Sequence, residues 1–306
     1  MNNTASQGEK TRLGIDVGGT QTKIAVVCED RIIHKYSINT ASVREEIIAD
    51  IIEEYNKMKE EYDVSSVGIC IAGSVVDDLV DTSNLPFHNY NLKAELKERI
   101  PCLAGIENDA NAAALAEAKY GLCESRKSLV LMTLGTGIGG GIILDGKLRS
   151  GRTGCFGEIG HMIVQAVGGE KCVCGQSGCL ERYASTSALI RNAQKACLEN
   201  KESILYEKYA LNGSLSGQDI FQAMDEGCPI AKKVFDNYTD YLAAGIDSVV
   251  NAYDPDAFVL TGGITGQGEK LLAPLKAKLN SKIEIRISKL QGDAGALGAT
   301  LLGMEA

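Results

Sequence analysis

Three cysteines lie within eight residues of one another in a glycine-containing segment near the middle of the sequence. They are Cys172, Cys174 and Cys179. Thiolates at this spacing suit a tetrahedral Zn²⁺ ion if a fourth ligand completes the set, with Zn–S distances of about 2.3 Å. His161 stands eleven residues before the first cysteine and is the simplest fourth ligand, although Cys155 or Cys197 could take its place. Because four protein ligands leave no open position for water, we expect a structural zinc site.

Two glycine-rich turns follow apolar segments of the sequence, at residues 16–20 (DVGGT) and at residues 133–137 (TLGTG). Glycine lets the backbone approach a phosphate closely, and successive N–H groups of such a turn form a binding site for anions. One such turn alone would more simply join the two strands of a hairpin. The two turns together predict a clamp for the phosphates of a triphosphate.

Charged and hydroxyl side chains accompany these turns. Asp16 could hold Mg²⁺ through water, because this hard ion keeps most of its hydration, and Lys23 adds positive charge. The hydroxyls of Thr20 and Thr136 are available to the phosphates. We therefore expect the nucleotide to contact residues of both turns. They are Asp16, Gly18, Gly19, Thr20, Lys23, Thr133, Gly135, Thr136 and Gly137.

The second turn also resembles other phosphate-binding motifs, but its surroundings argue against them. Residues 135–140 match the spacing of the dinucleotide fingerprint, which must open a helix, whereas residues 142–144 (IIL) are typical of a strand. Residues 141–147 nearly match a P-loop, but Leu148 stands where that motif needs a Ser or Thr for Mg²⁺. The sequence also lacks the HRD and DFG elements of protein kinases.

The elements that must position these residues alternate between strands and amphipathic helices. Strands are predicted at residues 13–17, 24–28, 31–38, 66–72, 129–134 and 256–260, and helices at residues 43–62, 109–120, 230–253 and 294–302. The pattern restarts at residue 129, and the equivalent residues Asp16 and Thr133 stand 117 positions apart. The sequence therefore predicts an α/β protein with an internal duplication.

Length and charge restrict the class of protein. A chain of 306 residues suggests about two domains. Its 31 basic and 40 acidic residues give a net charge of −9, which repels nucleic acids and anionic membranes, so neither partner is expected. We find no signal peptide and no window near the roughly 20 apolar residues of a membrane span. We therefore expect a cytoplasmic protein whose ten cysteines stay thiols.

The sequence resembles the ROK family (repressors, open reading frames and sugar kinases) of the actin and hexokinase superfamily, from about Leu13 to the C-terminus. The motifs that carry the resemblance are DVGGT at 16–20, ENDAN at 107–111, LGTGIG at 134–139, GEIGH at 157–161, CVCGQSGCLE at 172–181 and TGG at 261–263. The resemblance implies two RNase H-like (actin-like ATPase) lobes with an inter-lobe active-site cleft for ATP and sugar. We expect a small α/β lobe at residues 11–112 plus 294–306, and a large α/β lobe at residues 113–293 that carries the zinc site and the dimer surface.

Phosphoryl transfer to a sugar hydroxyl needs one carboxylate that accepts the hydroxyl proton. Asp109 stands at a predicted helix start, where backbone N–H groups and the helix dipole keep a carboxylate ionised, and it could equally be a plain N-cap. The resemblance implies that Asp109 is the catalytic base and that Asn108 contacts a sugar hydroxyl.

The resemblance also implies the remaining contacts. The sugar contacts are Gly73, Asn108, Asp109, Glu158, His161 and Glu181, and the nucleotide contacts extend to Gly262 and Gly263. His161, Cys172, Cys174 and Cys179 match the zinc site of the family. His161 could bind Zn²⁺ with one ring nitrogen and a sugar hydroxyl with the other. Many family kinases carry Pro before the glycine of the loop at Gly73, whereas this chain has Ala72, which leaves the identity of the sugar open.

The function expected from the resemblance is an ATP-dependent kinase that uses Mg²⁺ and phosphorylates the 6-hydroxyl of a hexose, with glucose as the expected acceptor. Kinases of N-acetylmannosamine, N-acetylglucosamine or fructose are alternatives, as are phosphate donors other than ATP. A sugar-responsive repressor of this family would carry an N-terminal helix-turn-helix, whereas twelve residues precede Leu13. A catalytically silent sensor would have lost Asp109 or the glycine turns. The family implies a homodimer or a dimer of dimers.

Overall fold

The computed structural model describes residues 9–121 and 127–304, which divide into two compact units. Unit 1 comprises the described parts of Met1–Leu131, Gly141–Gly157 and Ser288–Ala306. Unit 2 comprises Met132–Gly140 and Glu158–Ile287. The whole helix at residues 109–120 thus belongs to unit 1, whereas the predicted lobe boundary after residue 112 divides it between the two lobes. The lobe boundaries expected from the sequence stay a prediction.

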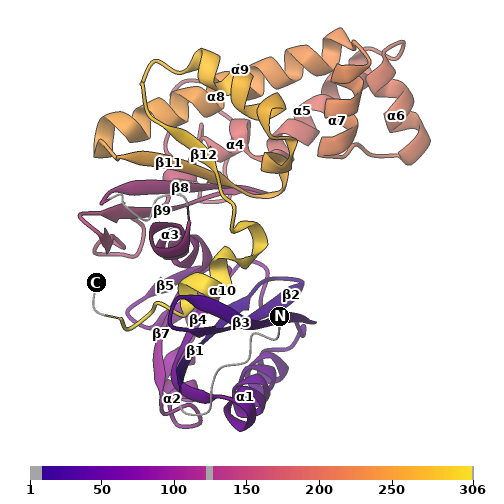
Figure 1. Cartoon of the computed structure of the whole chain (residues 1–306). Helices are drawn as coiled ribbons and strands as arrows, with labels where there is room; N and C mark the ends of the chain where they lie inside the picture. The colour runs from indigo at the N-terminus through magenta and orange to yellow at the C-terminus, as the bar shows by residue number, and fades with distance from the viewer. Residues whose placement is uncertain (1–8, 122–126, 305–306) are drawn as a thin grey trace. The chain divides into compact units, whose positions relative to one another are not determined.

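The elements follow one another along the chain as Figure 1 labels them. Unit 1 contains β1 (Lys10–Val17), β2 (Gln21–Cys28), β3 (Arg31–Asn39), α1 (Arg44–Glu61), β4 (Asp63–Ile71), β5 (Ser74–Val76), β6 (Leu79–Asp81), α2 (Leu92–Lys97), β7 (Leu103–Asn108), α3 (Asp109–Tyr120), β10 (Lys147–Leu148), η3 (Gln291–Asp293) and α10 (Ala294–Ala299). The strands β8 (Leu129–Leu134) and β9 (Ile138–Leu144) have residues in both units. Unit 2 contains η1 (Ile159–His161), α4 (Glu181–Ala184), α5 (Thr186–Glu199), α6 (Ile204–Asn212), α7 (Gly217–Asp225), α8 (Pro229–Tyr253), β11 (Ala257–Thr261), η2 (Gly263–Gln267), α9 (Glu269–Lys278) and β12 (Ile285–Ile287).

The first sheet has the strand order β3-β2-β1-β4-β7, in which β1, β4 and β7 run parallel. Because side chains alternate along a strand, Leu13 and Ile15 of β1 enter the core that α1 and α2 cover. Gly14 and Asp16 face the opposite side, where α10 and α3 pack (Figure 1). A Cβ on Gly14 would lie 1.9 Å from the carbonyl oxygen of Ala296, so glycine permits the close approach of α10.

The second sheet has the strand order β10-β9-β8-β11-β12 and repeats the arrangement of the first. In each sheet the first strand of the repeat is central, with the hairpin strands on one side and two later strands on the other. The first residues of β2 and β9, Gln21 and Ile138, are 117 positions apart, which is the offset of the two glycine turns. The predicted duplication and the predicted α/β fold class are therefore confirmed.

Unit 2 is organised around the long helix α8. Its apolar residues recur at a spacing of three and four, as in Phe235, Tyr238, Leu242 and Ile246, and all four are buried. The helix packs against α4, α5 and α9. It therefore supports both α4, which follows the cysteine cluster, and α5, which follows α4.

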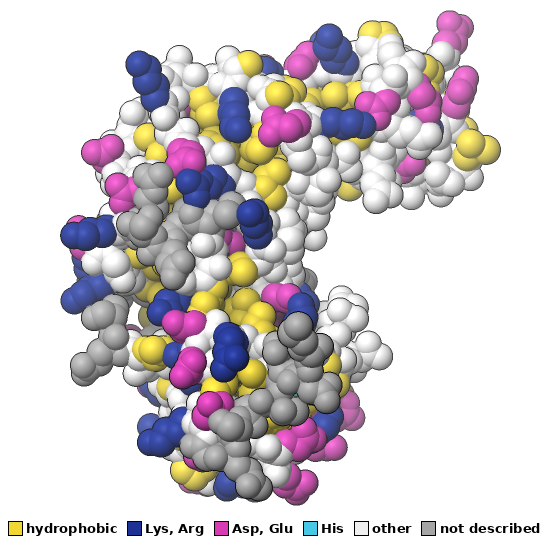
Figure 2. Space-filling model, viewed as in Figure 1, with side chains coloured by type: hydrophobic (Ala, Val, Ile, Leu, Met, Phe, Trp, Pro, Cys, Tyr) yellow, Lys and Arg dark blue, Asp and Glu magenta, His cyan; other side chains and the backbone are white. Residues whose placement is uncertain are grey.

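Figure 2 shows Lys and Arg interspersed with Asp and Glu on the face that it displays. Within residues 9–121 and 127–304, no helix combines the length and the apolar character that a membrane span requires.

Candidate functional site

The first glycine turn joins β1 to β2 and has Asp16 beside it. The N–H of Gly18 donates to the carbonyl oxygen of Gln21 at 3.1 Å and closes the hairpin. Asp16 pairs with Lys23 in the register of the two strands, and the Nζ of Lys23 lies 4.0 Å from Asp16 Oδ2. The same Nζ donates to the carbonyl oxygen of Gly292 at 2.7 Å. The predicted cation ligand, the predicted lysine and the first turn therefore lie together.

The carboxylate of Asp16 is 14% exposed and lies among close neighbours. The fully buried thiol of Cys70, on β4, donates to Asp16 Oδ1 at 3.4 Å. On the α10 side, a Cβ on Gly295 would lie 2.6 Å from Asp16 Oδ2. Burial raises the pKa of Asp16, while Lys23 and the Cys70 hydrogen bond lower it to a smaller extent. Burial also raises the pKa of Cys70, so this thiol stays protonated and acts as a donor to the carboxylate.

Asn108 and Asp109 lie where β7 ends and α3 begins. The Oδ1 of Asn108 accepts from the N–H groups of Ala110 at 2.9 Å and Asn111 at 3.0 Å, so Asn108 is the N-cap. Its Nδ2 donates to the carbonyl oxygen of Gly73 at 2.8 Å and to Asp109 Oδ1 at 3.1 Å. Asp109 is therefore the first residue of the helix, at the positive end of its dipole, and the capping role is filled by its neighbour.

These polar groups share one edge of the first sheet. Because β1, β4 and β7 are parallel neighbours, their carboxyl ends meet there, with Asp16 beside Cys70 and Ile71 beside Asn108 in the register. Ligands of α/β proteins bind outside the carboxyl ends of parallel strands. Unit 1 therefore brings the predicted cation ligand and the predicted base, Asp109, to one edge of one sheet.

The second glycine turn joins β8 to β9 and is bonded to a carboxylate. The N–H of Gly135 donates to the carbonyl oxygen of Gly137 at 3.0 Å, and the hydroxyl of Thr133 accepts a backbone N–H at 2.9 Å. The N–H of Ile138 donates to Glu181 Oε2 at 3.0 Å. A Cβ on Gly137 would lie 2.2 Å from the same oxygen, so glycine leaves room for the carboxylate. Glu181, a predicted sugar contact, is thus anchored to the predicted nucleotide turn.

A cavity of about 340 Å³ opens beside the second turn, within unit 2. Its volume lies in the range of small-molecule sites. Its walls come from the second turn, α5, α7 and η2, and they include the predicted contacts Gly135, Thr136 and Gly263. Gly262 directly precedes η2 with a φ of 108°, a conformation that favours glycine. Wall residues that the sequence analysis did not name include Ser187, Ile190, Gln218, Phe221 and Gln267.

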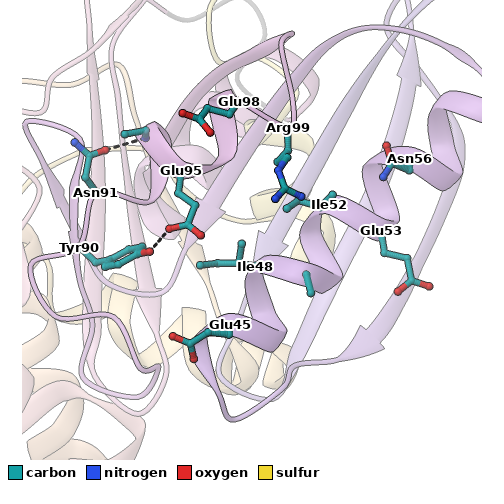
Figure 3. A pocket seen from close by; sticks show the side chains of 12 residues that line it. Glu45, Ile48, Ile52, Glu53, Asn56, Tyr90, Asn91, Glu95, Glu98 and Arg99 are labelled. Carbon is teal, nitrogen blue, oxygen red and sulfur yellow. Dashed lines mark hydrogen bonds between the residues drawn. The ribbon is translucent and has the colours of Figure 1, made fainter.

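A larger cavity of about 880 Å³ lies elsewhere in unit 1, between α1 and α2 (Figure 3). Glutamates surround it, and the hydroxyl of Tyr90 donates to one of them, Glu95. The glutamates are Glu45, Glu53, Glu95 and Glu98. The predicted site residues are not among those that line this cavity. The predicted site therefore does not include this cavity.

The four predicted zinc ligands come together in unit 2. Their donor atoms, in His161, Cys172, Cys174 and Cys179, all lie within 4.8 Å of one another. His161 Nδ1 is 3.6 Å from Cys172 Sγ, and the thiols of Cys174 and Cys179 are 3.6 Å apart. Ligands of a tetrahedral zinc ion at about 2.3 Å stand about 3.8 Å apart, so this donor set fits the metal. The alternative ligands Cys155 and Cys197 donate to backbone carbonyls of their own segments instead.

The thiols of this group differ in their surroundings. Burial raises the pKa of Cys179 to about 12. A hydrogen bond from the backbone of Gln176 lowers the pKa of the exposed Cys174. A bound zinc ion would hold such thiols as thiolates, so binding of the metal would release protons.

A β-bridge and two hydrogen bonds fasten the loop that carries the predicted metal ligands to its neighbours. An antiparallel bridge pairs Ile163 with Cys179. The carboxylate of Glu170 accepts from Arg182 at 3.2 Å and from Arg191 at 2.9 Å. Because these arginines belong to α4 and α5, the loop is tied to the helices that carry Glu181 and part of the cavity wall.

The two ring nitrogens of His161 have different surroundings. Nδ1 faces the thiol of Cys172, and Nε2 lies 3.8 Å from Glu158 Oε2. Both side chains are partly accessible, at 28% and 42% exposure. A metal on Nδ1 would leave the proton on Nε2, which could donate to Glu158 or to the hydroxyl of a ligand.

Comparison with known proteins identifies the family. A sequence model of the ROK family matches residues 12–305. The chain belongs to the ROK family. The glucokinase of Halalkalibacterium halodurans is 34% identical in an alignment 305 positions long, which covers 94% of this chain and 92% of that protein. A ROK family glucokinase from Streptomyces griseus, crystallised with glucose and AMPPNP, has a TM-score of 0.79 and 32% identity over 95% of this chain and 98% of its own. The xylose repressor of Bacillus subtilis is 29% identical over 94% of this chain and 75% of its own length.

In this ROK-family chain, the structure groups the predicted site residues within each unit. Unit 1 holds the first turn, Gly73, Asn108 and Asp109, and unit 2 holds the second turn, the four predicted metal ligands and the glycines at 262 and 263. The sequence analysis did not predict α5 and α7, whose residues form part of the wall of the cavity beside the second turn. Ser185 and Ser216 cap these helices, and such N-cap serines are the signal that could have located them.

Proposed function

We propose that this ROK-family protein is an ATP-dependent kinase that phosphorylates the 6-hydroxyl of a hexose, with glucose as the preferred acceptor. Similarity to glucokinases over nearly the whole chain supports the proposal. The observation that carries it is the arrangement of unit 1, in which Asp16, Asp109 and a glycine turn lie at one edge of one sheet. One carboxylate for a cation, one for a proton and a turn for phosphate are the parts that this reaction requires.

Asp109 acts as the general base in this proposal. Its carboxylate accepts the proton of the sugar hydroxyl while the hydroxyl oxygen bonds to the γ-phosphorus. The bond from the γ-phosphorus to the β–γ bridging oxygen breaks, and ADP leaves with that electron pair. Asn108 positions the base, because its side chain donates to Asp109 Oδ1 and is itself fixed by capping α3.

The nucleotide is held by backbone groups and by the cavity of unit 2. N–H groups of both turns bind the phosphates, and Lys23 adds positive charge near Asp16. The apolar side chains of Ile190 and Phe221, next to hydroxyl and amide groups, suit a base and a ribose. Asp16 would hold Mg²⁺, which when bound would supply positive charge that neutralises the transferring phosphoryl group.

The cysteine cluster holds a structural zinc ion in this proposal, with Cys172, Cys174, Cys179 and His161 as its ligands. His161 donates from Nε2 to a sugar hydroxyl next to Glu158, and a zinc ion bound at Nδ1 would fix the orientation of its ring. Asn108, Glu181 and the loop at Gly73 supply the remaining sugar contacts. A sugar that leaves these polar groups unpaired is rejected, because an unmatched buried group costs about 1–3 kcal/mol.

The test of the kinase proposal is a coupled assay of ADP release over a panel of sugars. The panel contains glucose, mannose, fructose, N-acetylglucosamine and N-acetylmannosamine, each with ATP and with polyphosphate as the donor. We expect the highest kcat/KM with glucose and ATP. A higher value with an N-acetyl hexosamine or with fructose would reassign the acceptor, and a lack of turnover with every sugar would contradict the kinase.

We also propose that the enzyme is a cytoplasmic homodimer, as its family implies. The cytoplasm supplies ATP and keeps the thiols of the metal site reduced. Light scattering should give twice the mass of the chain, or four times that mass for a dimer of dimers. A monomer at assay concentration would contradict this part of the proposal.

A further inference from the structure

One threonine, Thr40, donates hydrogen bonds to two carbonyl groups of the first glycine turn. Thr40 follows β3, and its N–H donates to the carbonyl oxygen of Thr20 at 3.0 Å. Its hydroxyl donates to the carbonyl oxygen of Gly18 at 2.8 Å. The hydroxyl of Thr22 lies 2.9 Å from that of Thr40. Since the single hydroxyl proton of Thr40 is used on Gly18, Thr22 is the donor to Thr40.

A second threonine holds the second turn in the same manner. Thr186 is the first residue of α5, and its N–H donates to the carbonyl oxygen of Gly135 at 2.9 Å. Its hydroxyl donates to the carbonyl oxygen of Leu134 at 3.3 Å. The residue 117 positions after Thr40 is Gly157, so Thr186 is not its counterpart in the repeat. The two units therefore reach the same arrangement with different elements.

The bonds to the carbonyl groups determine where the neighbouring N–H groups point. In a trans peptide the carbonyl and the following N–H lie on opposite sides of the backbone, and the described peptides are trans. The bond to the Gly18 carbonyl therefore fixes the N–H of Gly19, and the bond to the Gly135 carbonyl fixes the N–H of Thr136. These N–H groups belong to the set that the proposed function assigns to phosphate.

We propose that Thr40 and Thr186 are positioning residues, which aim the N–H groups of the two glycine turns at the phosphates of the nucleotide. This inference rests on the proposed function. Both hydroxyl protons are already donated to turn carbonyls, so neither hydroxyl is available as a hydrogen-bond donor to the nucleotide. Held in this way, a glycine-rich turn keeps one backbone conformation before the ligand arrives, and less entropy is lost when ATP binds.

The test removes each hydroxyl and keeps the shape of the side chain. Thr40→Val and Thr186→Val keep the N–H bond of each threonine and lose the hydroxyl bond, while Thr40→Ser and Thr186→Ser are the matched controls. Calorimetry gives the Kd of ATP and of adenosine, which has no phosphate, and kinetics give kcat and both KM values. Thermal melting checks that each variant folds.

We expect Thr40→Val to raise the Kd of ATP roughly 3- to 10-fold, the loss of one ordinary hydrogen bond. Thr186→Val should raise the Kd of ATP less, because the hydrogen bond of the Thr186 hydroxyl is longer. This bond also fixes the peptide between Leu134 and Gly135, whose N–H already donates to Gly137 within the turn. The Kd of adenosine and the KM of the sugar should stay unchanged, and the serine variants should match the wild type. If Thr40→Val does not fold, Thr22→Val supplies the test, with a smaller rise in the Kd of ATP.

Two results would overturn the inference. The first is an unchanged Kd of ATP in the folded valine variants. The second is an equal loss of affinity for ATP and adenosine, which would mean that the hydroxyls contact the nucleoside. In both cases a wild type that phosphorylates sugar would leave the proposed function intact. A wild type that binds no ATP and turns over no sugar would instead contradict the proposed function itself.

Discussion

The two glycine turns occupy equivalent places in the duplicated fold, yet they differ in charge. At the positions that correspond to Asp16 and Lys23, the second turn has Thr133 and Gly140. The first turn thus has opposite charges 4.0 Å apart, and the second has a hydroxyl that accepts a backbone N–H instead. The shared backbone suits both turns to anions, while the added side chains suit the first one to a cation as well.

The carboxylate that contacts the second turn belongs to a residue outside the repeated segment. Glu181 bonds to the N–H of Ile138 and fills the space above Gly137, whose counterpart in the first turn is Thr20. Glu181 also stands two positions after the predicted metal ligand Cys179. The comparison teaches that one folding unit can be used twice and specialised by neighbours that the repeat does not contain.

The largest expected effect separates the carboxylates Asp109 and Glu181. Asp109→Asn should lower kcat by about 10²–10⁴-fold, the usual loss when a general base is removed, and leave the Kd of glucose largely unchanged. Glu181→Gln keeps the size of the side chain and should mainly raise the KM of the sugar. Steady-state kinetics and calorimetry measure both variants. Turnover of Asp109→Asn at the wild-type rate would remove Asp109 from the role of base.

A second pair of variants tests the charge difference between the turns. Asp16→Asn should lower kcat/KM by roughly 10- to 100-fold at limiting Mg²⁺, as expected when a group that holds a metal through water is lost. Thr133→Val, at the equivalent place, should not change the dependence on Mg²⁺. Titration of activity against Mg²⁺ measures both. Equal Mg²⁺ dependence in the two variants would show that the turns do not differ in this way.

The same Asp16 variant should be more stable than the wild type in the absence of ligands. Burial raises the pKa of Asp16, so the ionised carboxylate costs folding free energy at neutral pH. Asparagine has no such cost, and Asp16→Asn should melt at a higher Tm. The difference should narrow as the pH falls through the pKa of the folded carboxyl, where the wild type also becomes neutral. A lower Tm for the variant at pH 7 would contradict this reasoning.

Loss of the metal should affect unit 2, which contains the second turn and the predicted metal ligands. Chelation or Cys174→Ser should lower the Tm and raise the KM of the sugar by roughly 10- to 100-fold, because the ring of His161 loses its fixed orientation. Cys155→Ser, another exposed cysteine, is the matched control and should behave as wild type. Melting curves, metal analysis and kinetics measure these effects. An unchanged KM in metal-free protein would exclude a link between the metal and the sugar.

The smallest expected effect concerns the glycines of the turns. Gly137→Ala should cost about 1–3 kcal/mol of unfolding free energy, because its Cβ would overlap the Glu181 carboxylate. Gly19→Ala should cost less, since its Cβ would meet only Asn84 at 3.8 Å. Denaturant unfolding gives both values. Glu181→Ala should recover stability in the Gly137→Ala background, and no recovery would show that the overlap is not the cause.

Local patterns were sufficient to predict most of the fold around the site. The helix at 109–120 and the strand at 129–134 are observed with the predicted bounds, and the strand order confirms the duplication. Glycine turns, alternating apolar residues and helical periodicity all depend on neighbours in sequence, so they can be read from it. The grouping of His161 with the three cysteines was also predicted, because three of these four residues lie in one short loop.

Long-range contacts were not predictable in the same way. The bond from Cys70 to Asp16 spans 54 positions, and those of Thr40 and Thr186 reach back to turns made by other strands. The N-cap residue of α3 could not be predicted from the sequence either, although the two candidates are adjacent in the chain. Asp109 and Asn108 are both good N-cap residues, and only the backbone angles decide that Asn108 takes the role.

Phosphorus NMR of the wild-type protein with ATP, Mg²⁺ and glucose tests the central claim most directly. The account predicts loss of the γ-phosphorus signal of ATP, with growth of ADP and of one sugar phosphate whose phosphorus couples to the two protons on carbon 6. Inorganic phosphate as the only new product, phosphate on a different sugar carbon, or unchanged ATP would contradict it.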